Sequence, residues 1–384
     1  MKKVLSYVLT ALLSCALTLT AVAAMTRETV VYSKLDQLQQ VIDLYFINEP
    51  DKEAMEDAAA DAMVSMLGDR WSYYMTAEEY QSYVDTMANS YVGVGMTVQI
   101  NADGKGIDVV QVTAGGPAEE AGLQNGDILV AVDGQSIAGV ELTEASALVK
   151  GEAGTQVKLT VLRGDQQLEL TATRRAIQTP VATATMLEGN VGLVRIVNFD
   201  SRCFDETKTA IESLLVQGAE SIIFDVRFNP GGYKAELVKV LDYLLPEGEI
   251  FRSEYYNGNV GVDKSDAACL EVPMAVLVNQ DSYSAAEFFA AALDEYDWAV
   301  TVGTQTCGKS YFQNCYRLSD GSAVNISIGK YYTPKGVSLA EVGGLVPNVV
   351  VEVGEDVAAG IYYGTIDPME DPQILAALEA LKNR

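Results

Sequence analysis

The chain has 384 residues and a formal net charge of −27, and it contains no histidine. The length allows two or three domains, and the acidity argues against nucleic acid as a partner, because binding a polyanion requires clustered Lys and Arg. The absence of histidine excludes Ser-His-Asp and Cys-His catalysis and every His-ligated zinc site. A hydrolase of this composition must activate its nucleophile with a lysine, a carboxylate or a metal held by other ligands.

The N-terminus has the pattern of an export signal. Lys2 and Lys3 precede an apolar stretch, and the small residues at 21–23 form a cleavage site. We expect residues 1–24 to be a signal peptide, or a membrane anchor if they are retained, because the apolar run is nearly long enough to span a bilayer. Either outcome makes the protein extracytoplasmic, secreted or anchored to the outer face of the cytoplasmic membrane.

Residues 25–90 have apolar side chains at helical spacing, which predicts a small N-terminal helical region. Within it, Thr76 and Glu79 form a capping box that starts a short helix. From 91 to 175 the pattern changes to alternating strands, glycine turns and a short helix near 142–150. That change predicts a separate β-rich domain.

Strands and helices alternate over residues 176–360. The expected strands are 191–197, 221–226, 274–278 and 299–302, and the expected helices are 205–217, 234–245 and 284–296. This order predicts an α/β core with mostly parallel strands. A hairpin over 311–328 follows the last of these strands, and residues 361–384 form a C-terminal helical tail.

Two loops of this core carry residues suited to catalysis. The loop from Asp225 to Gly232 follows a buried strand, and its glycines leave backbone N–H groups unobstructed, as an oxyanion hole requires. Ser284 opens a helix, where unsatisfied N–H groups and the helix dipole stabilise developing negative charge. Helix capping by Ser282 or Ser284 and a plain strand-to-helix turn at the glycines remain alternatives.

A third loop, residues 303–310, satisfies the phosphate-loop pattern GxxxxGK[ST]. Together with Asp225 as a magnesium ligand, it makes a nucleotide-hydrolysing enzyme an alternative. The context argues against that alternative, because a phosphate loop must open a helix. The residues after Lys309 alternate as in a strand instead.

Three segments resemble motifs of the C-terminal processing (tail-specific) serine peptidases with a PDZ domain. Ser282-Tyr-Ser-Ala-Ala-Glu287 is similar to their serine motif, Cys307-Gly-Lys-Ser310 to their lysine loop, and Arg227-Phe-Asn-Pro-Gly-Gly232 to their glycine loop. The separation of 25 residues between Ser284 and Lys309 also agrees with the family. The resemblance covers nearly the whole chain. It implies a ClpP/crotonase-like α/β catalytic core with an inserted PDZ domain.

The resemblance implies Ser284 as the nucleophile, Lys309 as the general base and Gln313 as the residue that positions the lysine. It assigns the oxyanion hole to the N–H groups of Gly231 and Ala285. Only a neutral lysine can accept the serine proton, so Lys309 must be buried enough to lower its pKa. Neither a cofactor nor a metal is expected.

The PDZ-like segment implies peptide capture. An extended peptide would add as a strand beside Met96, with its terminal carboxylate on the turn formed by Gly93, Val94 and Gly95. We therefore expect an endopeptidase whose partners are proteins or peptides with accessible C-termini. A catalytically inactive peptide-binding scaffold is the alternative from another class of function, and homo-oligomerisation is left open.

Four cysteines follow the signal segment, and an oxidising compartment would permit disulfides. Cys307 and Cys315 flank Lys309, and we predict that they pair and limit the motion of the base. Cys203 and Cys269 are then the second candidate pair. Four reduced thiols are the alternative.

Overall fold

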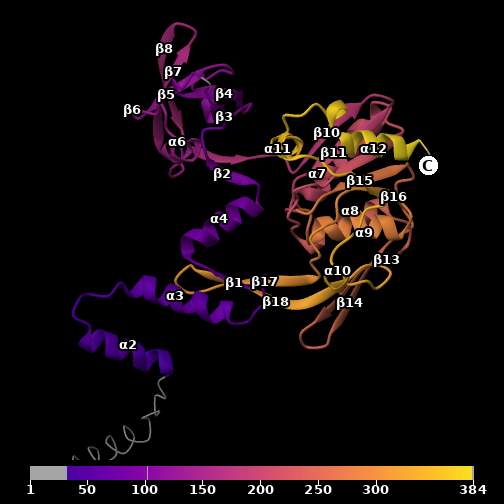
Figure 1. Ribbon diagram of the computed structural model, residues 1–384, viewed down its shortest axis with the longest axis horizontal. Coiled ribbons are helices and arrows are strands. Elements are labelled where there is room, and N and C mark those ends of the chain that lie inside the picture. The colour runs from indigo at the N-terminus through magenta and orange to yellow at the C-terminus, as the bar shows by residue number, and fades with distance from the viewer. Residues whose placement is uncertain (1–32, 102, 383–384) are drawn as a thin grey trace, which may run out of the picture. The chain divides into compact units, whose positions relative to one another are not determined.

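The computed structural model describes residues 33–101 and 103–382 (Figure 1), so the predicted signal segment lies outside the described residues. The chain divides into two compact units between Met63 and Val64. No helix in the described ranges is long and apolar enough to cross a membrane.

The first unit contains α2 (Lys34–Tyr45) and most of α3 (Lys52–Ser65). A capping box starts α2: the Ser33 hydroxyl accepts a hydrogen bond from the Asp36 N–H, and the Asp36 carboxylate accepts one from the Ser33 N–H. No side chain of α2 or α3 is buried. These helices follow the predicted apolar spacing, but they enclose no core of their own.

The second unit begins with β1 (Tyr73–Met75) and α4 (Ala77–Met87). The predicted capping box is present at the start of α4, where the Thr76 side chain accepts from the Glu79 N–H at 3.3 Å. The Glu79 carboxylate accepts in return from the Thr76 N–H at 2.9 Å. β1 pairs antiparallel with β18 (Ala323–Tyr332), which ties this N-terminal segment to residues far along the chain.

The β-rich domain is an insertion whose two ends lie side by side. Its connecting strands β2 (Ser90–Gly93) and β9 (Arg175–Gln178) pair antiparallel. Between them the chain forms β3 (Met96–Ile100), β4 (Ile107–Val112), α5 (Pro117–Glu120), β5 (Ile128–Val132), β6 (Gln135–Ser136), α6 (Leu142–Val149), β7 (Gln156–Arg163) and β8 (Gln166–Thr173). Ile107, Leu129 and Leu159 are fully buried in a core separate from that of the α/β domain.

The α/β core is built on a six-stranded sheet in the order β10-β11-β12-β15-β16-β19. These strands are β10 (Ala182–Leu187), β11 (Val191–Ile196), β12 (Ser221–Asp225), β15 (Met274–Val278), β16 (Ala299–Gly303) and β19 (Val349–Val350). β10 is antiparallel to β11, and the other neighbours are parallel. The predicted α/β fold is confirmed.

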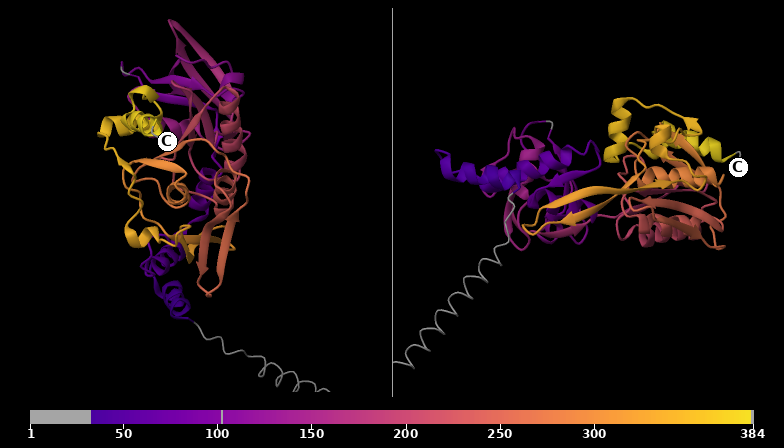
Figure 2. Two further views of the ribbon diagram at one scale, coloured as in Figure 1. Left: turned by 90° about the vertical axis from the view of Figure 1, so that its right-hand side faces the viewer. Right: turned by 90° about the horizontal axis from the view of Figure 1, so that it is seen from below.

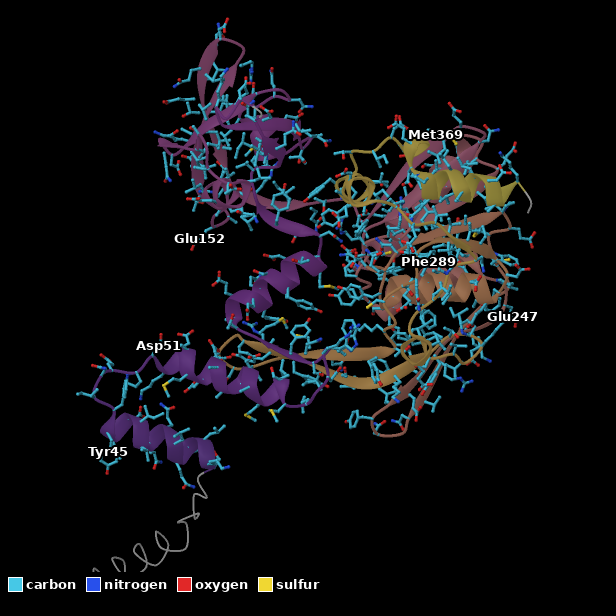
Figure 3. All side chains as sticks on the ribbon, viewed as in Figure 1. Tyr45, Asp51, Glu152, Glu247, Phe289 and Met369 are labelled. Carbon is cyan, nitrogen blue, oxygen red and sulfur yellow. The ribbon has the colours of Figure 1, made fainter. Side chains whose placement is uncertain are left out.

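Helices cover both faces of this sheet (Figures 1 and 2). On one face lie α7 (Cys203–Val216), α8 (Lys234–Leu244) and α9 (Ala285–Glu295), and on the other lies α12 (Pro372–Leu381). Phe289 of α9 (Figure 3) contacts the rings of Phe199 and Phe224 with centroids 6.0 and 5.3 Å apart. Because both faces are covered, the central strands β12 and β15 are buried throughout.

A second sheet has the strand order β1-β18-β13-β14, with β17 (Tyr311–Arg317) also paired to β18. The predicted β17–β18 hairpin is present. The hairpin of β13 (Gly248–Tyr255) and β14 (Val260–Ser265) was not predicted, because charged residues and glycines interrupt its apolar alternation. The remaining elements are α10 (Leu339–Val342), α11 (Glu355–Tyr363) and a 3₁₀ turn at Pro368–Glu370.

The parallel strands determine where a site can form. β12, β15 and β16 are neighbours and run in the same direction, so the loops that follow them leave from one edge of the sheet. These are the glycine loop, the serine loop and the lysine loop of the sequence analysis. The carboxyl edge of such a sheet is where open α/β folds place their ligands.

Candidate active site

The three loops contribute to a cavity of about 830 Å³. Its lining includes Gly232, Ser284, Ala285, Lys309 and Gln313. The fold thus brings the predicted nucleophile, base and positioning residue to one cavity. Their individual contacts differ in part from the prediction.

Ser284 lies at the junction between its loop and α9. Its backbone has φ 58° and ψ −123°, a conformation that is costly for any residue other than glycine. The side chain makes no capping hydrogen bond to α9, so simple helix capping does not account for it. The N–H of Ala285 follows directly and has no acceptor in the part of the chain that the structure describes, which leaves it available to an oxyanion.

Ser282 has a different environment. It is fully buried, its hydroxyl accepts from the Asn279 N–H at 3.0 Å, and it donates to the Val226 carbonyl at 2.7 Å. These bonds hold the serine loop against the end of β12. Of the two serines in the motif, only Ser284 lines the cavity.

The glycine loop packs directly against Ser284. Gly231 has φ +91°, and a Cβ at this position would lie 2.7 Å from the Ser284 Cβ and 2.8 Å from the Ala285 nitrogen. Any side chain at 231 would therefore fill the space beside the nucleophile.

The prediction that the Gly231 N–H is an oxyanion donor needs correction for this conformation. That N–H donates to the Asn229 side-chain oxygen at 2.8 Å, and the Asn229 amide is itself fixed on the Ile196 carbonyl. The N–H of Gly232 has no acceptor among the described residues, and Gly232 lines the cavity. The two available amides are therefore those of Gly232 and Ala285.

Lys309 meets the electrostatic requirement for a base. It is 9% exposed, and burial lowers its pKa to about 8 despite the opposing effect of nearby Cys307 and Asp69. Desolvation disfavours the ammonium form, so roughly a tenth of the molecules carry a neutral amine at pH 7, far more than for an ordinary lysine. The side chain can therefore act as a proton acceptor.

The surroundings of Lys309 include a residue that the sequence analysis did not identify. The Lys309 amine lies over the ring of Trp71, 4.4 Å from its centroid, and 6.0 Å from that of Tyr283. Trp71 precedes β1 and is fixed there because its carbonyl accepts from the Asn325 side chain on β18. Only the long-range pairing of β1 with β18 brings it to the lysine, so no local pattern could have indicated it.

The side chains of Ser284 and Lys309 are not joined by a hydrogen bond in the described structure. Tyr331 lies beside the lysine loop: its phenol donates to the Lys309 carbonyl, and it lines the same cavity as Ser284. Tyr331 is buried, and burial raises its pKa well above the ordinary value. It therefore remains a neutral hydrogen-bonding group at this site.

The side chain of Gln313 points to a different partner from the one predicted. Its amide donates to the Ser327 hydroxyl at 3.0 Å and to the Tyr311 carbonyl at 3.1 Å. A register irregularity between Phe312 and Gln313 accompanies this arrangement. Gln313 lines the cavity with Lys309, but it does not contact the lysine amine in this conformation.

Glu287 anchors the lysine loop, a role that the sequence analysis left unassigned although the residue ends the serine motif. It is fully buried, and burial raises the pKa of its carboxyl group. The carboxylate accepts from the Thr306 hydroxyl, from the Gly308 N–H at 2.7 Å and from the Lys309 N–H at 2.9 Å. α9 therefore carries Ser284 at its start and, one turn later, the residue that fixes the backbone of Lys309.

The predicted disulfides are absent: all four described cysteines are free thiols. Cys315 lies within the extended strand β17, whereas Cys307 lies in the loop before that strand. Cys307 instead accepts from the Arg70 guanidinium at 3.1 Å. Cys203 is packed in the core beside Thr207, and burial raises its pKa to about 12.

The phosphate-loop alternative is wrong in this fold. Residues 303–310 lead from β16 into β17, so no helix N-terminus follows Lys309. Asp225 is paired with the Arg227 guanidinium at 2.7 Å rather than open to a metal. In residues 33–101 and 103–382, no group of three or more Cys, Asp or Glu side chains is arranged to hold a metal ion.

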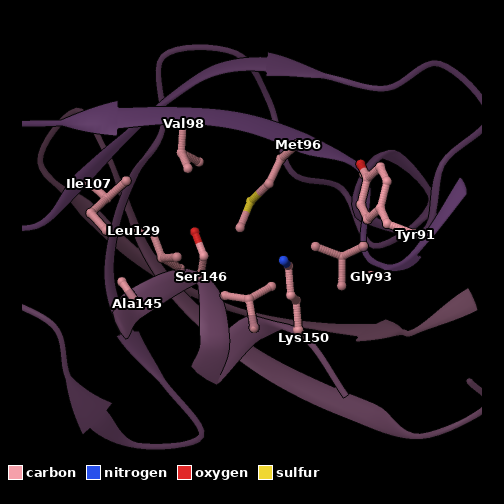
Figure 4. Close-up of a pocket in the computed structure, with 12 residues that line it drawn as sticks. Tyr91, Gly93, Met96, Val98, Ile107, Leu129, Ala145, Ser146 and Lys150 are labelled. Atoms are coloured by element: carbon pink, nitrogen blue, oxygen red, sulfur yellow. The ribbon is translucent and has the colours of Figure 1, made fainter. Parts of the chain in front are cut away.

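The inserted domain has a pocket of its own (Figure 4), lined by Tyr91, Gly93, Val94, Gly95, Met96, Val98, Ile107, Leu129, Ala145, Ser146, Val149 and Lys150. The predicted peptide-binding residues 93–96 thus form one wall, and α6 forms the other. The N–H groups of Val94 and Gly95 have no acceptor among the described residues. Lys150 is the one charged residue in this lining, and its amine points into the pocket toward Met96.

Comparisons with known proteins agree with this fold. Residues 190–351 match peptidase family S41, and residues 109–163 match the PDZ domain. The chain is 33% identical to the carboxy-terminal processing protease CtpA of Bacillus subtilis over 325 residues, which cover 84% of this chain and 69% of that protein. It is 31% identical to the carboxyl-terminal-processing protease of Synechocystis over 330 residues, which cover 84% of this chain and 76% of that protein.

Among solved structures, the chain is similar to a proposed S41 protease from Bacteroides fragilis. The TM-score is 0.57 at 18% sequence identity, and the superposition covers 88% of this chain and 93% of that one. At that identity the likeness shows a shared fold.

The α/β core and the inserted PDZ domain define the class of protein as a serine-type peptidase with a peptide-binding module. Within that class, the chain belongs to peptidase family S41, with the carboxy-terminal processing proteases.

Proposed function

We propose that the chain is an exported endopeptidase that cleaves proteins recognised by their C-termini, with Ser284 as the nucleophile and Lys309 as the general base. One observation carries the proposal: a buried lysine with a pKa of about 8 lines the same cavity as a serine held at the start of a helix. In a chain without histidine, this lysine is the group in the cavity able to accept the serine proton.

In the proposed reaction, the neutral Lys309 amine takes the proton of the Ser284 hydroxyl while the serine oxygen bonds to the substrate carbonyl carbon. The carbonyl electrons move to its oxygen, where the N–H groups of Gly232 and Ala285 donate to the new oxyanion. When the oxyanion collapses, the peptide C–N bond breaks, and the Lys309 ammonium returns the proton to the leaving amine. Water then attacks the acyl-enzyme by the same proton route and releases the new carboxylate.

The present contacts of Lys309 imply one conformational step before the first proton transfer. The amine must leave the face of Trp71 and approach the Ser284 hydroxyl. A cation–aromatic contact stabilises the ammonium by about 0.5–2 kcal/mol. Trp71 therefore favours the protonated, inactive form, and bound substrate must replace that contact.

The PDZ pocket supports the proposed recognition of C-termini. Its apolar walls suit an apolar terminal side chain, while the free N–H groups of Val94 and Gly95 suit a terminal carboxylate. The Lys150 ammonium adds a positive charge inside the same pocket. A substrate held here raises the local concentration of its scissile segment.

The decisive test compares proteolysis by the purified wild type with that of Ser284→Ala and Lys309→Ala, using unfolded proteins with apolar C-termini. Each variant should lose at least about 1,000-fold in kcat while keeping the wild-type circular dichroism spectrum, because the two groups act as one unit. Ser282→Ala is the matched control and should keep measurable activity, although loss of its loop contacts lowers stability. An active Ser284→Ala variant would refute the assignment.

The alternative function, an inactive peptide-binding scaffold, has one observation in its favour. The Lys309 amine and the Gln313 amide each contact groups other than those that the dyad requires. A scaffold would bind free C-termini in the PDZ pocket and cleave nothing, so the same experiment separates the two functions.

A further inference from the structure

The charge of the cavity around Ser284 is opposite to that of the chain as a whole. The sequence has 53 acidic residues against 26 basic ones. Yet the cavity lining contains Arg70, Lys234 and Lys309 and no Asp or Glu. Most of the rest is aromatic or apolar, and Arg70 itself is exposed to solvent at this cavity.

Arg70 is held in place without being neutralised. Its guanidinium lies over the Trp71 ring, 4.2 Å from the centroid, and one of its nitrogens donates to the Cys307 thiol at 3.1 Å. A thiol is a weak acceptor, and a stacked guanidinium keeps its remaining N–H donors free at the edge. No carboxylate pairs with Arg70 within the described chain.

The neighbouring charges do not change this conclusion. The Asp69 carboxylate accepts from the Ser72 hydroxyl at 2.6 Å and from the Trp71 N–H at 3.1 Å, and Asp69 does not line the cavity. Lys234 lines the cavity but pairs with Asp263 at 2.6 Å. Arg70 is therefore a permanent cation of this lining for which the described residues supply no counter-ion.

We propose that Arg70 is a specificity residue that binds an acidic side chain of the substrate close to the scissile bond. Trp71 contacts both the Arg70 guanidinium and the Lys309 amine, so a carboxylate on Arg70 lies near the bond that Ser284 attacks. The proposal rests on the proposed peptidase function and names its substrate class: apolar segments that carry Asp or Glu beside the cleavage site. The free guanidinium edge matches a carboxylate in a bidentate manner.

The experiment measures kcat/KM of the full chain on peptides that share one apolar C-terminus. They differ at single positions around the cleavage site, where Glu, Gln or Lys is placed in turn. We expect wild type to prefer Glu over Gln by roughly fivefold at one or two positions, and the preference should fall as salt is raised. A parallel set with amidated C-termini separates an internal carboxylate from the terminal one.

The most informative variants remove or reverse the charge at position 70. Arg70→Gln should bring the Glu-to-Gln ratio to about one, and Arg70→Glu should invert the order so that Lys peptides are cleaved best. Rates on different peptides are compared as ratios within one variant. The charge at position 70 also affects Lys309, and that effect changes the rate on every substrate by the same factor. Lys330→Gln is the matched control, since Lys330 lies over the Tyr311 ring at 5.7 Å but does not line the cavity.

The outcomes separate this inference from the proposed function. Cleavage by wild type with equal rates for Glu, Gln and Lys peptides, or an unchanged Glu preference in Arg70→Gln, overturns the role of Arg70 and leaves the peptidase intact. A preference that disappears on amidation assigns the carboxylate to the substrate C-terminus and also overturns the proposal. No cleavage of any peptide, with wild type and Ser284→Ala alike, overturns the proposed function itself.

Discussion

Lys309 in the catalytic cavity and Lys150 in the PDZ pocket both belong to largely apolar linings, but the two lysines differ in burial. Lys309 is 9% exposed and is enclosed by Trp71, Tyr283 and the loop fixed by Glu287. Lys150 follows the end of α6 and lines the PDZ pocket while remaining exposed to solvent. Burial lowers the pKa of Lys309 to about 8, which makes it a candidate base, whereas an exposed ammonium is suited to pair with a carboxylate.

The difference shows that the environment of a lysine, rather than its presence, determines its chemistry. In the catalytic cavity, buried hydrogen bonds fix the backbone around the lysine, as an active site requires. In the PDZ pocket, backbone N–H groups without an acceptor among the described residues and the exposed Lys150 ammonium are available to a ligand. Variants in the catalytic cavity should therefore leave peptide binding by the PDZ pocket unchanged, and variants in the PDZ pocket should leave kcat unchanged.

Among the variants that test this comparison of the two regions, the largest effect is expected at the anchor of the lysine loop. Glu287→Ala removes the acceptor of the Gly308 and Lys309 N–H groups, so the base loses its position and kcat should fall about 100-fold. Binding of a free C-terminal peptide to the PDZ pocket, measured by fluorescence anisotropy, should not change.

A matched control lies on the same helix. The Glu295 carboxylate also accepts two hydrogen bonds, from the Thr333 hydroxyl at 2.6 Å and from the Lys335 N–H at 2.7 Å, but Glu295 does not line the cavity. Glu295→Ala should keep kcat near that of wild type. Equal losses in both variants would mean that α9 is merely destabilised and that Glu287 does not position the base.

The next effect concerns stability. Because the pKa of Lys309 is about 8 in the folded state and 10.5 in the reference state, the unfolded chain binds more protons between these values. The lysine thus opposes folding below pH 8, and its unfavourable contribution fades as pH rises through this window. At pH 7, the free energy of unfolding of Lys309→Met should exceed that of wild type by on the order of 2 kcal/mol, which denaturant titration would show as a higher midpoint. The difference between the two proteins should be smaller at pH 10. The exposed Lys330→Met is the control, and a gain of equal size there would contradict the assignment.

The smallest effect is expected in the PDZ pocket. Lys150→Met removes the positive charge and keeps the apolar stem, so the preference for free over amidated C-termini should fall by roughly fivefold. The loss should appear in KM and not in kcat, because the ammonium lies outside the catalytic cavity. Lys105→Met, on an exposed turn of the same domain, is the control. A change in kcat with Lys150→Met would show that the two regions are coupled.

The parts of the fold and site that could be predicted are those set by local sequence. The apolar strands β12, β15 and β16 were identifiable from their runs of buried residues, and each is followed by a loop whose motif gave Ser284, Lys309 and the glycines. Parallel order then brings these loops to one edge of a sheet.

The remaining features depend on pairings between distant segments. Trp71 reaches Lys309 only because β1 joins β18, and the Gln313 amide meets Ser327 because the two residues are partners in the β17–β18 pairing. The Gly231 N–H donates to the side-chain oxygen of Asn229, two residues earlier. This contact depends on the orientation of one side chain. Cysteine spacing suggested a disulfide across Lys309, but the extended strand β17 carries Cys315 away from the lysine loop.

The central claim is that Ser284 is the nucleophile and is activated by a buried lysine. The most direct measurement is the rate at which a fluorophosphonate probe labels the protein as a function of pH, with the modified residue located by mass spectrometry. The account predicts a single adduct on Ser284, a labelling rate that rises with pH and has its midpoint near the Lys309 pKa of about 8, and no labelling of Lys309→Ala. An adduct on Ser282, or labelling of Ser284 that persists unchanged in Lys309→Ala, would contradict it.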